Sequence, residues 1–497
     1  MKARFAVVLV ILGMVALSCT SGGRTAIVEV KEVGVQAGAA ASDDANLSEG
    51  GAGSVSIGGP GTIGTRTTGG GGADPKCATN ANAEHGFTAS TMKWGTYVPL
   101  TGALRPLGEQ TARVMKVASE TWLNSITKIP GPYDLDWGCS QRAGIYGRKV
   151  ELKVLSLSQN NQDEAFQQMR RLIDVEKVFL VRDCYLQSNL MGPATGYQNQ
   201  KGVPGVWCSY SEMPLPRLDK WNFSPGVDPL KVTGVNVGYM LHTLKKQRLG
   251  IIADPSIKDL HVEVTKKIYR HIHGRDIPDG CIILKQAQQA QNGMETEIAQ
   301  LRTCYNGQSP DSIIAMDVLN AAFGALEAKD QGWTPDQVQW ACLTCWIKAI
   351  AELCGDACTN MITDCQALPC IPWADRNQYP AAGTLRDTWS QYLSRDPEDI
   401  LTYGPAAITG GLGLWLGMTG PELSREKLRG TLENLKNWDA GIGPVLNTSP
   451  EDHYGGKSVW LMKFTGTANS PMPWFDDITG RFVPLSEVNV PESLTRT

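Results

Sequence analysis

The sequence has little charge and no excess of either sign. Lys and Arg number 46 and Asp and Glu number 50 in 497 residues, and charged residues make up 19% of the chain. A nucleic-acid-binding protein carries a basic patch or stripe, so this balance excludes nucleic acid as the main partner. The length leaves room for more than one compact domain besides unstructured extensions.

Familiar catalytic and metal-binding motifs are also missing. The chain has only 6 histidines, no G-x-S-x-G turn, no P-loop and no H-E-x-x-H pair. His271 and His273 are two residues apart, which points their side chains to different sides of a helix. "GPGTIG" (Gly59 to Gly64) matches the dinucleotide fingerprint only formally, because no strand precedes it and no helix follows. We therefore expect no enzyme, no cofactor and no resident metal.

The first 18 residues have the pattern of a signal peptide. Lys2 and Arg4 precede an apolar run from Phe5 to Leu17, which is shorter than the ~20 residues that span a bilayer. The following "ALSC" resembles a bacterial lipobox, with Ala16 where Leu is usual, and this resemblance implies that Cys19 becomes an acylated N-terminus. We predict a lipid-anchored, extracytoplasmic lipoprotein; the alternative is an ordinary secretory signal with a coincidental cysteine.

A flexible linker is expected to follow the anchor, over residues 19–90. From Gly34 to about Asp74 the chain is rich in Gly, Ala, Ser and Thr and poor in large apolar residues. Such a segment buries too little surface to offset the entropy of ordering it, and its composition suits a tether between a membrane anchor and a folded body.

The cysteines point to an oxidising compartment. Of the 13 cysteines, 12 remain when Cys19 is set aside, and disulfides persist in exported proteins. Their pairing does not follow from spacing, although Cys281 and Cys304 are expected to bracket one strand–helix unit. The Cys-rich segment 342–370 begins with C-x₂-C and continues with C-x₃-C, a spacing also found in zinc sites. Disulfides are the favoured interpretation, zinc is the alternative, and a redox pair is disfavoured because Cys342 closes an apolar strand.

Apolar strands alternate with amphipathic helices from about Met92 onward. Helical faces include Met115, Ala118 and Trp122, and the row Leu260, Val264 and Ile268. Eight segments are predicted to be strands: "WGTYVPL", "VELKVLSL", "VFLVRD", "GVWCS", "LGIIAD", "CIILKQ", "SIIAMD" and "WACLTC". Continuous apolar strands alternating with helices predict parallel sheets covered on both faces. Because the pattern occurs twice, we predict an α/β protein with two doubly wound lobes.

The order of these elements resembles one family. "VPLTGALRPLGEQTARVMKVASETWLNSI", the turn and strand in "AGIYGRKVELKVLSLS", and the late "DAGIGPVLNTSPEDHYGGKSVWLMKF" are similar to segments of branched-chain amino-acid-binding proteins. These are type I periplasmic binding proteins that serve ABC importers. The resemblance implies two lobes joined by three hinge crossovers, with lobe 1 at 91–220 plus about 370–445, and lobe 2 at 221–369 plus about 446–497.

The resemblance also implies a solute site between the lobes and a membrane permease as partner. The first lobe would contribute three loops, which carry Thr101, Arg105, Tyr185, Gln187, Ser188, Ser209, Tyr210 and Ser211. The second lobe would contribute Ser256, Asp317, Thr344 and Trp346. Hydroxyl and amide groups at strand ends orient a ligand, while aromatic faces exclude water. The alternatives to ligand binding are purely structural roles: the serines would cap turns, the tyrosines would pack at the lobe edge, and Arg105 and Asp317 would be solvated loop charges.

Two departures from the family pattern bear on the ligand. The loop that reads "CLTC" lacks the carboxylate that meets an amino acid's ammonium group, and "PSIKD" follows "IIAD" where an aromatic residue is usual. An α-amino-acid ligand is therefore disfavoured, and Asp317 is the candidate to replace the lost charge. Two other classes stay open: a ligand-sensing receptor domain, and a lipid-anchored enzyme, for which no set of nucleophile, base and orienting group is visible.

Overall fold

The computed structural model describes a folded body that begins at Asp74. The described residues are 74–101, 105–128, 135–157, 162–183, 188–207, 220–343, 345, 348–365, 387, 391–392, 400–439, 444–465 and 475–495. The predicted signal peptide, Cys19 and the Gly-rich stretch lie outside them. Within the described ranges, no helix combines the length and apolarity needed to cross a membrane.

The first sheet is entirely parallel, and its order is β11-β5-β4-β3-β1-β2. Its strands are β1 (Thr91–Pro99), β2 (Lys149–Leu157), β3 (Leu180–Asp183), β4 (Gly205–Trp207), β5 (Asn222–Val227) and β11 (Tyr454–Gly456). Strands β1 and β2 pair over their full length, from Thr91 with Lys149 to Pro99 with Leu157. Strand β1 therefore lies inside the sheet, between β3 and β2.

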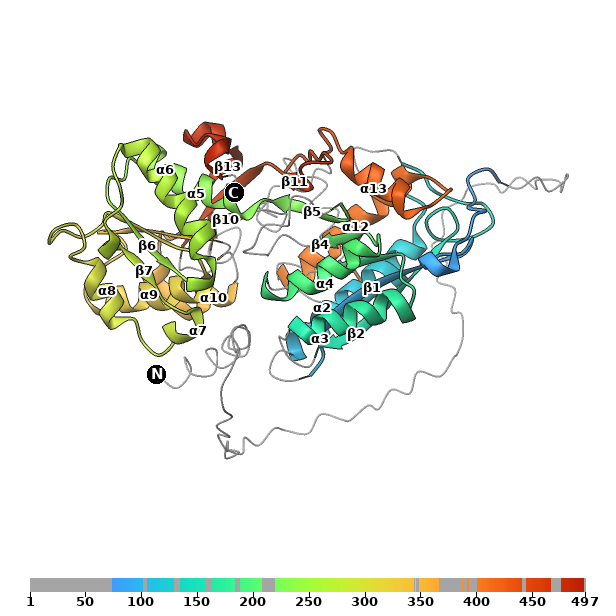
Figure 1. Ribbon diagram of the computed structural model, residues 1–497, viewed down its shortest axis with the longest axis horizontal. Helices are drawn as coiled ribbons and strands as arrows, with labels where there is room; N and C mark the ends of the chain where they lie inside the picture. Colours follow the sequence, from blue (N-terminus) through green and yellow to red (C-terminus); the bar gives the residue numbers. More distant parts are fainter. Residues whose placement is uncertain are drawn as a thin grey trace, which may run out of the picture. The chain divides into compact units, whose positions relative to one another are not determined.

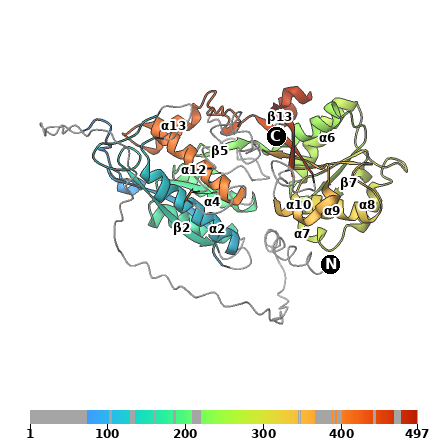
Figure 2. The ribbon, with the colours of Figure 1, turned by 180° about the vertical axis from the view of Figure 1, so that it is seen from behind.

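Helices cover both faces of this sheet (Figures 1 and 2). They are α2 (Arg105–Lys116), α3 (Gln162–Arg170), α4 (Ser188–Gln200), α12 (Ile400–Thr419) and α13 (Arg425–Glu433). On one face, Trp94 of β1 belongs to the same buried cluster as Met115 and Trp415 from the α2 and α12 side. On the other face, which α3 and α4 cover, Tyr97 of β1 belongs to a buried cluster with Met169 of α3. The alternation along β1 thus supplies both faces of the core.

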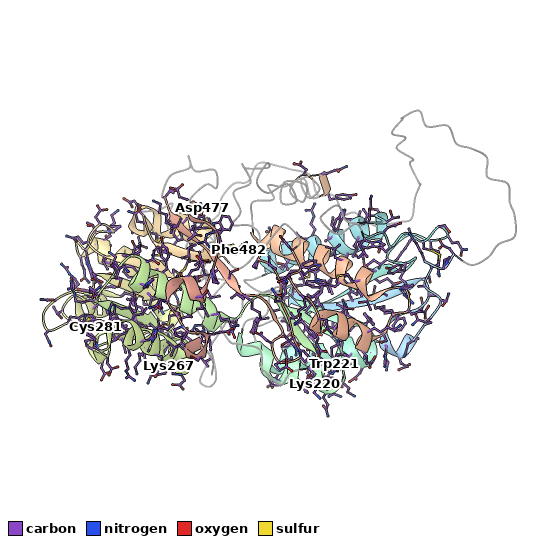
Figure 3. All side chains as sticks on the ribbon, turned by 90° about the horizontal axis from the view of Figure 1, so that it is seen from above. Lys220, Trp221, Lys267, Cys281, Asp477 and Phe482 are labelled. Carbon is purple, nitrogen blue, oxygen red and sulfur yellow. A yellow bond between two sulfur atoms is a disulfide. The ribbon has the colours of Figure 1, made fainter. Side chains whose placement is uncertain are left out.

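The second sheet has the order β13-β12-β10-β9-β8-β6-β7. Its strands are β6 (Leu249–Ala253), β7 (Ile282–Leu284), β8 (Ser312–Ala315), β9 (Gln339–Cys342), β10 (Ile362–Cys365), β12 (Ser458–Phe464) and β13 (Phe475–Pro484). Strands β6 to β10 are parallel, whereas β12 runs antiparallel to β10 and β13 antiparallel to β12. Phe482 of β13, labelled in Figure 3, packs edge-on against Trp460 of β12, with ring centroids 5.3 Å apart.

This sheet is also covered on both faces. Its helices are α5 (Pro229–Gly238), α6 (Glu263–His273), α7 (Ala287–Ala290), α8 (Glu295–Leu301), α9 (Val318–Asp330) and α10 (Lys348–Cys354). Ile251 and Ile314 belong to the cluster with α5 and α6, while Ile252 and Ile313 belong to the cluster with α8 and α9. Two mostly parallel sheets with helices on both faces confirm the predicted α/β fold.

The body starts earlier than the residue-91 boundary that we expected. Cys77 forms a disulfide with Cys139, and Phe87 packs edge-on against Phe179 at 5.5 Å between ring centroids. Residues 74–90 are therefore part of the folded body. The Gly-rich composition ends near Asp74, and beyond it the segment carries side chains that can be buried or cross-linked.

A buried arginine fastens this N-terminal segment to the turn before β2. Gly144 and Gly147 of the turn have positive φ values of 94° and 80°, and a Cβ on Gly144 would lie 2.1 Å from the Arg148 carbonyl oxygen. The turn thus requires glycine. The Arg148 guanidinium donates to the carbonyl oxygens of Thr88 at 2.7 Å, Asn80 at 2.9 Å and Pro421 at 2.6 Å.

The chain passes between the two sheets at three places. It leaves the first sheet after Val227 to enter α5, returns after β10 to α12, and leaves again between Gly456 of β11 and Ser458 of β12. We predicted that residues from 221 and from 446 onward belong to lobe 2, but β5 and β11 are in the first sheet. Both boundaries therefore lie later than predicted. The prediction missed these two strands because "NFSPGV" and "YGG" lack the continuous apolar pattern of the other strands.

Candidate functional site

The carboxyl ends of the parallel strands in the second sheet bring several polar residues to one edge. Backbone bonds fix these ends: Met316 N–H donates to Ile252, Leu343 N–H to Ala315, and Lys285 N–H to Ala253. Asp254, Lys285, Asp317 and the Cys342 loop therefore follow neighbouring strands. Ligands of open α/β sheets bind at this kind of edge.

Asp317 is the most distinctive group at this edge. It caps α9, and its carboxylate accepts hydrogen bonds from the Asn320 N–H at 2.9 Å and from the Asn320 side-chain amide at 2.6 Å. The residue is buried, with 4% exposure. Burial, with the nearby charge of Asp254 as a smaller contribution, raises the pKa of Asp317 to about 6. A carboxyl whose pKa is shifted by burial at a strand end marks a candidate binding site.

The nearby lysine is engaged with another carboxylate. Lys285 Nζ lies 2.7 Å from Glu297 Oε1, while the Lys285 carbonyl accepts the Asn320 amide at 2.9 Å. Asn320 therefore joins the Lys285 backbone to the Asp317 carboxylate. The ion pairs among the described residues include none with Asp317, whose two carboxylate oxygens both accept hydrogen bonds from Asn320.

Disulfides occupy the cysteines of the next loop. Cys342 pairs with Cys345, and Cys354 with Cys358, and Cys365 is disulfide-bonded too. These described cysteines are thus paired as disulfides, the interpretation that the sequence favoured over a zinc site. The Cys342–Cys345 bridge closes the loop at the end of β9, and Cys342 Sγ is 3.9 Å from the Asp317 carbonyl oxygen.

The site residues predicted in the first lobe are only partly described. Thr101 is exposed after β1, and Arg105 is exposed at the start of α2, where its Nε lies 2.6 Å from Glu109. Ser188 begins α4, and nothing is described of its side chain. Tyr185, Gln187, Ser209, Tyr210 and Ser211 lie outside the described residues.

In the second lobe, Ser256 lies in the turn Pro255–Ile257 after β6, without a described side chain, and Thr344 and Trp346 lie outside the described residues. The structure thus brings Ser256 and Asp317 to one sheet edge, and the composition of the full site stays a prediction. Sequence analysis did not single out Asp254, Lys285 and Asn320. The signal for the first two was their position at the end of the predicted strand segments "LGIIAD" and "CIILKQ".

The fold and this edge define a class: a two-sheet α/β binding protein. Residues 91–469 match the family model described as periplasmic binding protein. The chain belongs to this family. Membership supports a solute-binding role outside the cytoplasm. A search of curated proteins finds no match.

Solved structures share the fold at low sequence identity. A leucine binding protein from Thermotoga maritima has 16% identity and a TM-score of 0.60, over 80% of this chain and 100% of that one. An ABC transporter substrate-binding protein from Sphaerobacter thermophilus has 13% identity and a TM-score of 0.63, over 80% and 98%. A branched-chain amino acid transporter substrate binding protein from Streptococcus pneumoniae, in complex with isoleucine, has 13% identity and a TM-score of 0.57, over 76% and 97%.

Proposed function

We propose that this chain is a lipid-anchored, extracytoplasmic solute-binding protein that captures a small molecule and delivers it to an ABC permease. The observation that carries the proposal is the pair of mostly parallel sheets joined by three crossings, with a buried carboxyl at the strand ends of the second sheet. Family membership supports the binding role.

Capture would proceed by hinge closure. A ligand favours closure only through contacts that exist in the closed state and not in the open one. Shifting the equilibrium from mostly open to mostly closed takes about 5.5 kcal/mol of differential affinity. Contacts from one lobe exist in both states, so the second-lobe group Asp317 must act together with groups of the first lobe, for which Thr101, Tyr185 and Ser209 are the candidates.

The ligand would present a positive charge or a strong hydrogen-bond donor to Asp317. No carboxylate stands in the Cys342–Cys345 loop, where the family's amino-acid binders place one, and Asp317 follows the adjacent strand β8. This shift of the charge by one strand favours an amine whose shape differs from that of an α-amino acid.

A thermal-shift screen tests this function. We expect one class of amine to raise the melting temperature of the purified body, while leucine and isoleucine have little effect, because a ligand present at 100 times its Kd stabilises a protein by about 2.7 kcal/mol. Mass spectrometry should recover the solute unchanged. Turnover of the solute would favour the enzyme alternative, and stabilisation by none of the amines, amino acids, aromatic acids or amides tested would contradict the proposal.

The lipid anchor has its own test. Cys19→Ser should move the protein from the membrane fraction to the soluble extracytoplasmic fraction, because acyl chains anchor a protein by burying CH₂ groups, worth ~0.8 kcal/mol each. Labelling with an alkyne-bearing fatty acid should mark the wild type and not the variant. Cys77→Ser is the matched control, since it removes a cysteine of the disulfide-bonded body. Retention of label in Cys19→Ser would refute acylation at this residue.

A further inference from the structure

Two of the three crossings are linked by a cluster of charges around the buried Lys231. Lys231 stands in the first turn of α5, three residues after Asp228, which caps the helix. Lys231 Nζ lies 2.7 Å from Glu492 and 3.4 Å from Asp452. Asp452 also pairs with Lys457, at 2.7 Å. Asp452 precedes β11 of the first sheet, and Lys457 is the residue between β11 and β12.

One member of the cluster is buried, and its partners are partly exposed, with 38% of the Asp452 side chain and 49% of the Glu492 side chain in contact with solvent. The Lys231 side chain is only 7% exposed. Burial opposes its charge, but the Glu492 and Asp452 carboxylates outweigh this cost and raise the pKa of Lys231 above its ordinary value. Burial also acts to raise the pKa of Asp452, yet Lys457 and Lys231 lower it overall. Removing Asp452 would leave the buried Lys231 ammonium with only one of its two carboxylate partners, Glu492.

The surroundings leave the charged groups room to rearrange. A cavity of about 470 Å³ is lined by Lys231, Lys457 and the C-terminal segment from Pro484 to Glu492. The segment therefore does not fill the space around the two ammonium groups. A hinge motion can alter these ion pairs without forcing side chains into one another.

We propose that Asp452 is a positioning residue that couples two hinge crossovers, by receiving Lys231 from the first and Lys457 from the third. Its carboxylate is on the side of the first sheet, and both ammonium groups stand where the chain enters elements of the second sheet. The two crossovers then turn together. This inference rests on the hinge closure proposed above, because it concerns how that closure is regulated. The residues involved lie outside the proposed solute site.

Hydrogen exchange measured by mass spectrometry tests the coupling without any ligand. Asp452→Asn keeps the oxygen that accepts the Tyr454 N–H at 3.2 Å. It removes the charge and replaces the oxygen that faces Lys231 and Lys457 with an amide nitrogen, which cannot accept their hydrogen bonds. We expect amide exchange in the first turn of α5 to accelerate about fivefold or more, although that turn lies 221 positions away in sequence. Reciprocally, Lys231→Met should accelerate amide exchange across Tyr454–Val459. Asp452→Glu, which keeps the charge, should exchange as slowly as the wild type in both segments.

The matched control is Glu487→Gln, which breaks the exposed Arg481–Glu487 pair in the same C-terminal region and should leave both crossovers unchanged. Exchange in α9 reports any global loss of stability. If Asp452→Asn affects only residues 452–459, or nothing, Asp452 is a local loop group and the inference is wrong. Because no solute enters this experiment, its outcome is independent of the ligand screen.

Discussion

Arg148→Met should lower the free energy of unfolding of the body by about 3–5 kcal/mol. The guanidinium is 2% exposed, and it donates to carbonyl oxygens of three separate segments, at Thr88, Asn80 and Pro421. Methionine fills similar space but donates nothing. The partly buried carbonyls of Thr88 and Asn80 then lose their donor, at about 1–3 kcal/mol each, whereas the Pro421 carbonyl keeps the Leu423 N–H. Burial lowers the pKa of Arg148 to about 10, so the side chain is charged at neutral pH.

Urea unfolding measures this loss, and limited proteolysis shows where it begins. We expect cleavage within residues 74–90 before the rest of the body opens, because Asn80 and Thr88 lie in that segment. Lys149→Met is the matched control: it removes the exposed charge of the adjacent residue and should change stability by no more than about 0.5 kcal/mol. If the two variants were equally stable, Arg148 would not be the fastener that its contacts indicate.

The sequence predicted the parallel strands well because their signal is local. "LGIIAD", "SIIAMD" and "WACLTC" are continuous apolar runs, and they form β6, β8 and β9 of one sheet. Cys281 and Cys304 were expected to bracket a strand–helix unit, and their disulfide closes the unit that holds β7 and α8. In each case the information lies within a few residues or at the ends of one unit.

Strands defined only by distant partners were not predictable in this way. Strand β11 has three residues, "YGG", and it exists because it pairs with β5, where Val227 aligns with Gly456 from 229 positions earlier along the chain. Strand β5 contains Pro225, which a sequence pattern counts against a strand. The fastening role of Arg148 was equally hidden, because its acceptors come from segments that only the fold brings together.

For Asp317 the sequence predicted the position but not the burial. A residue just after an apolar strand is exposed or enclosed according to its neighbours, and here Asn320 and the Lys285 backbone enclose the carboxylate. The described residues thus place one predicted site residue in an environment that disfavours its own charge. A fold tolerates such a cost more readily at functional positions than elsewhere.

Asp317→Asn should therefore be more stable than the wild type at neutral pH, by up to about 3 kcal/mol. Burial raises the pKa of this carboxyl from 3.8 to about 6, and one pKa unit corresponds to about 1.36 kcal/mol. Between these pH values the folded wild type binds more protons than the unfolded chain, so its stability falls as pH rises. Asparagine keeps the helix cap but has no proton to lose, so the advantage of the variant should vanish below about pH 4.

Chemical unfolding at pH 4, 5, 6 and 7 measures how the free energy of unfolding depends on pH. The control is Asp330→Asn, at the other end of α9, whose free energy of unfolding should follow that of the wild type at every pH. Parallel profiles for Asp317→Asn and the wild type would show a carboxyl without the burial cost.

The same proton links stability to binding. An amine held by the Asp317 carboxylate should bind the wild type more tightly as pH rises through about 6, whereas its affinity for Asp317→Asn should be weaker and independent of pH. A stabilised variant that binds poorly would show that the charge is retained for the ligand.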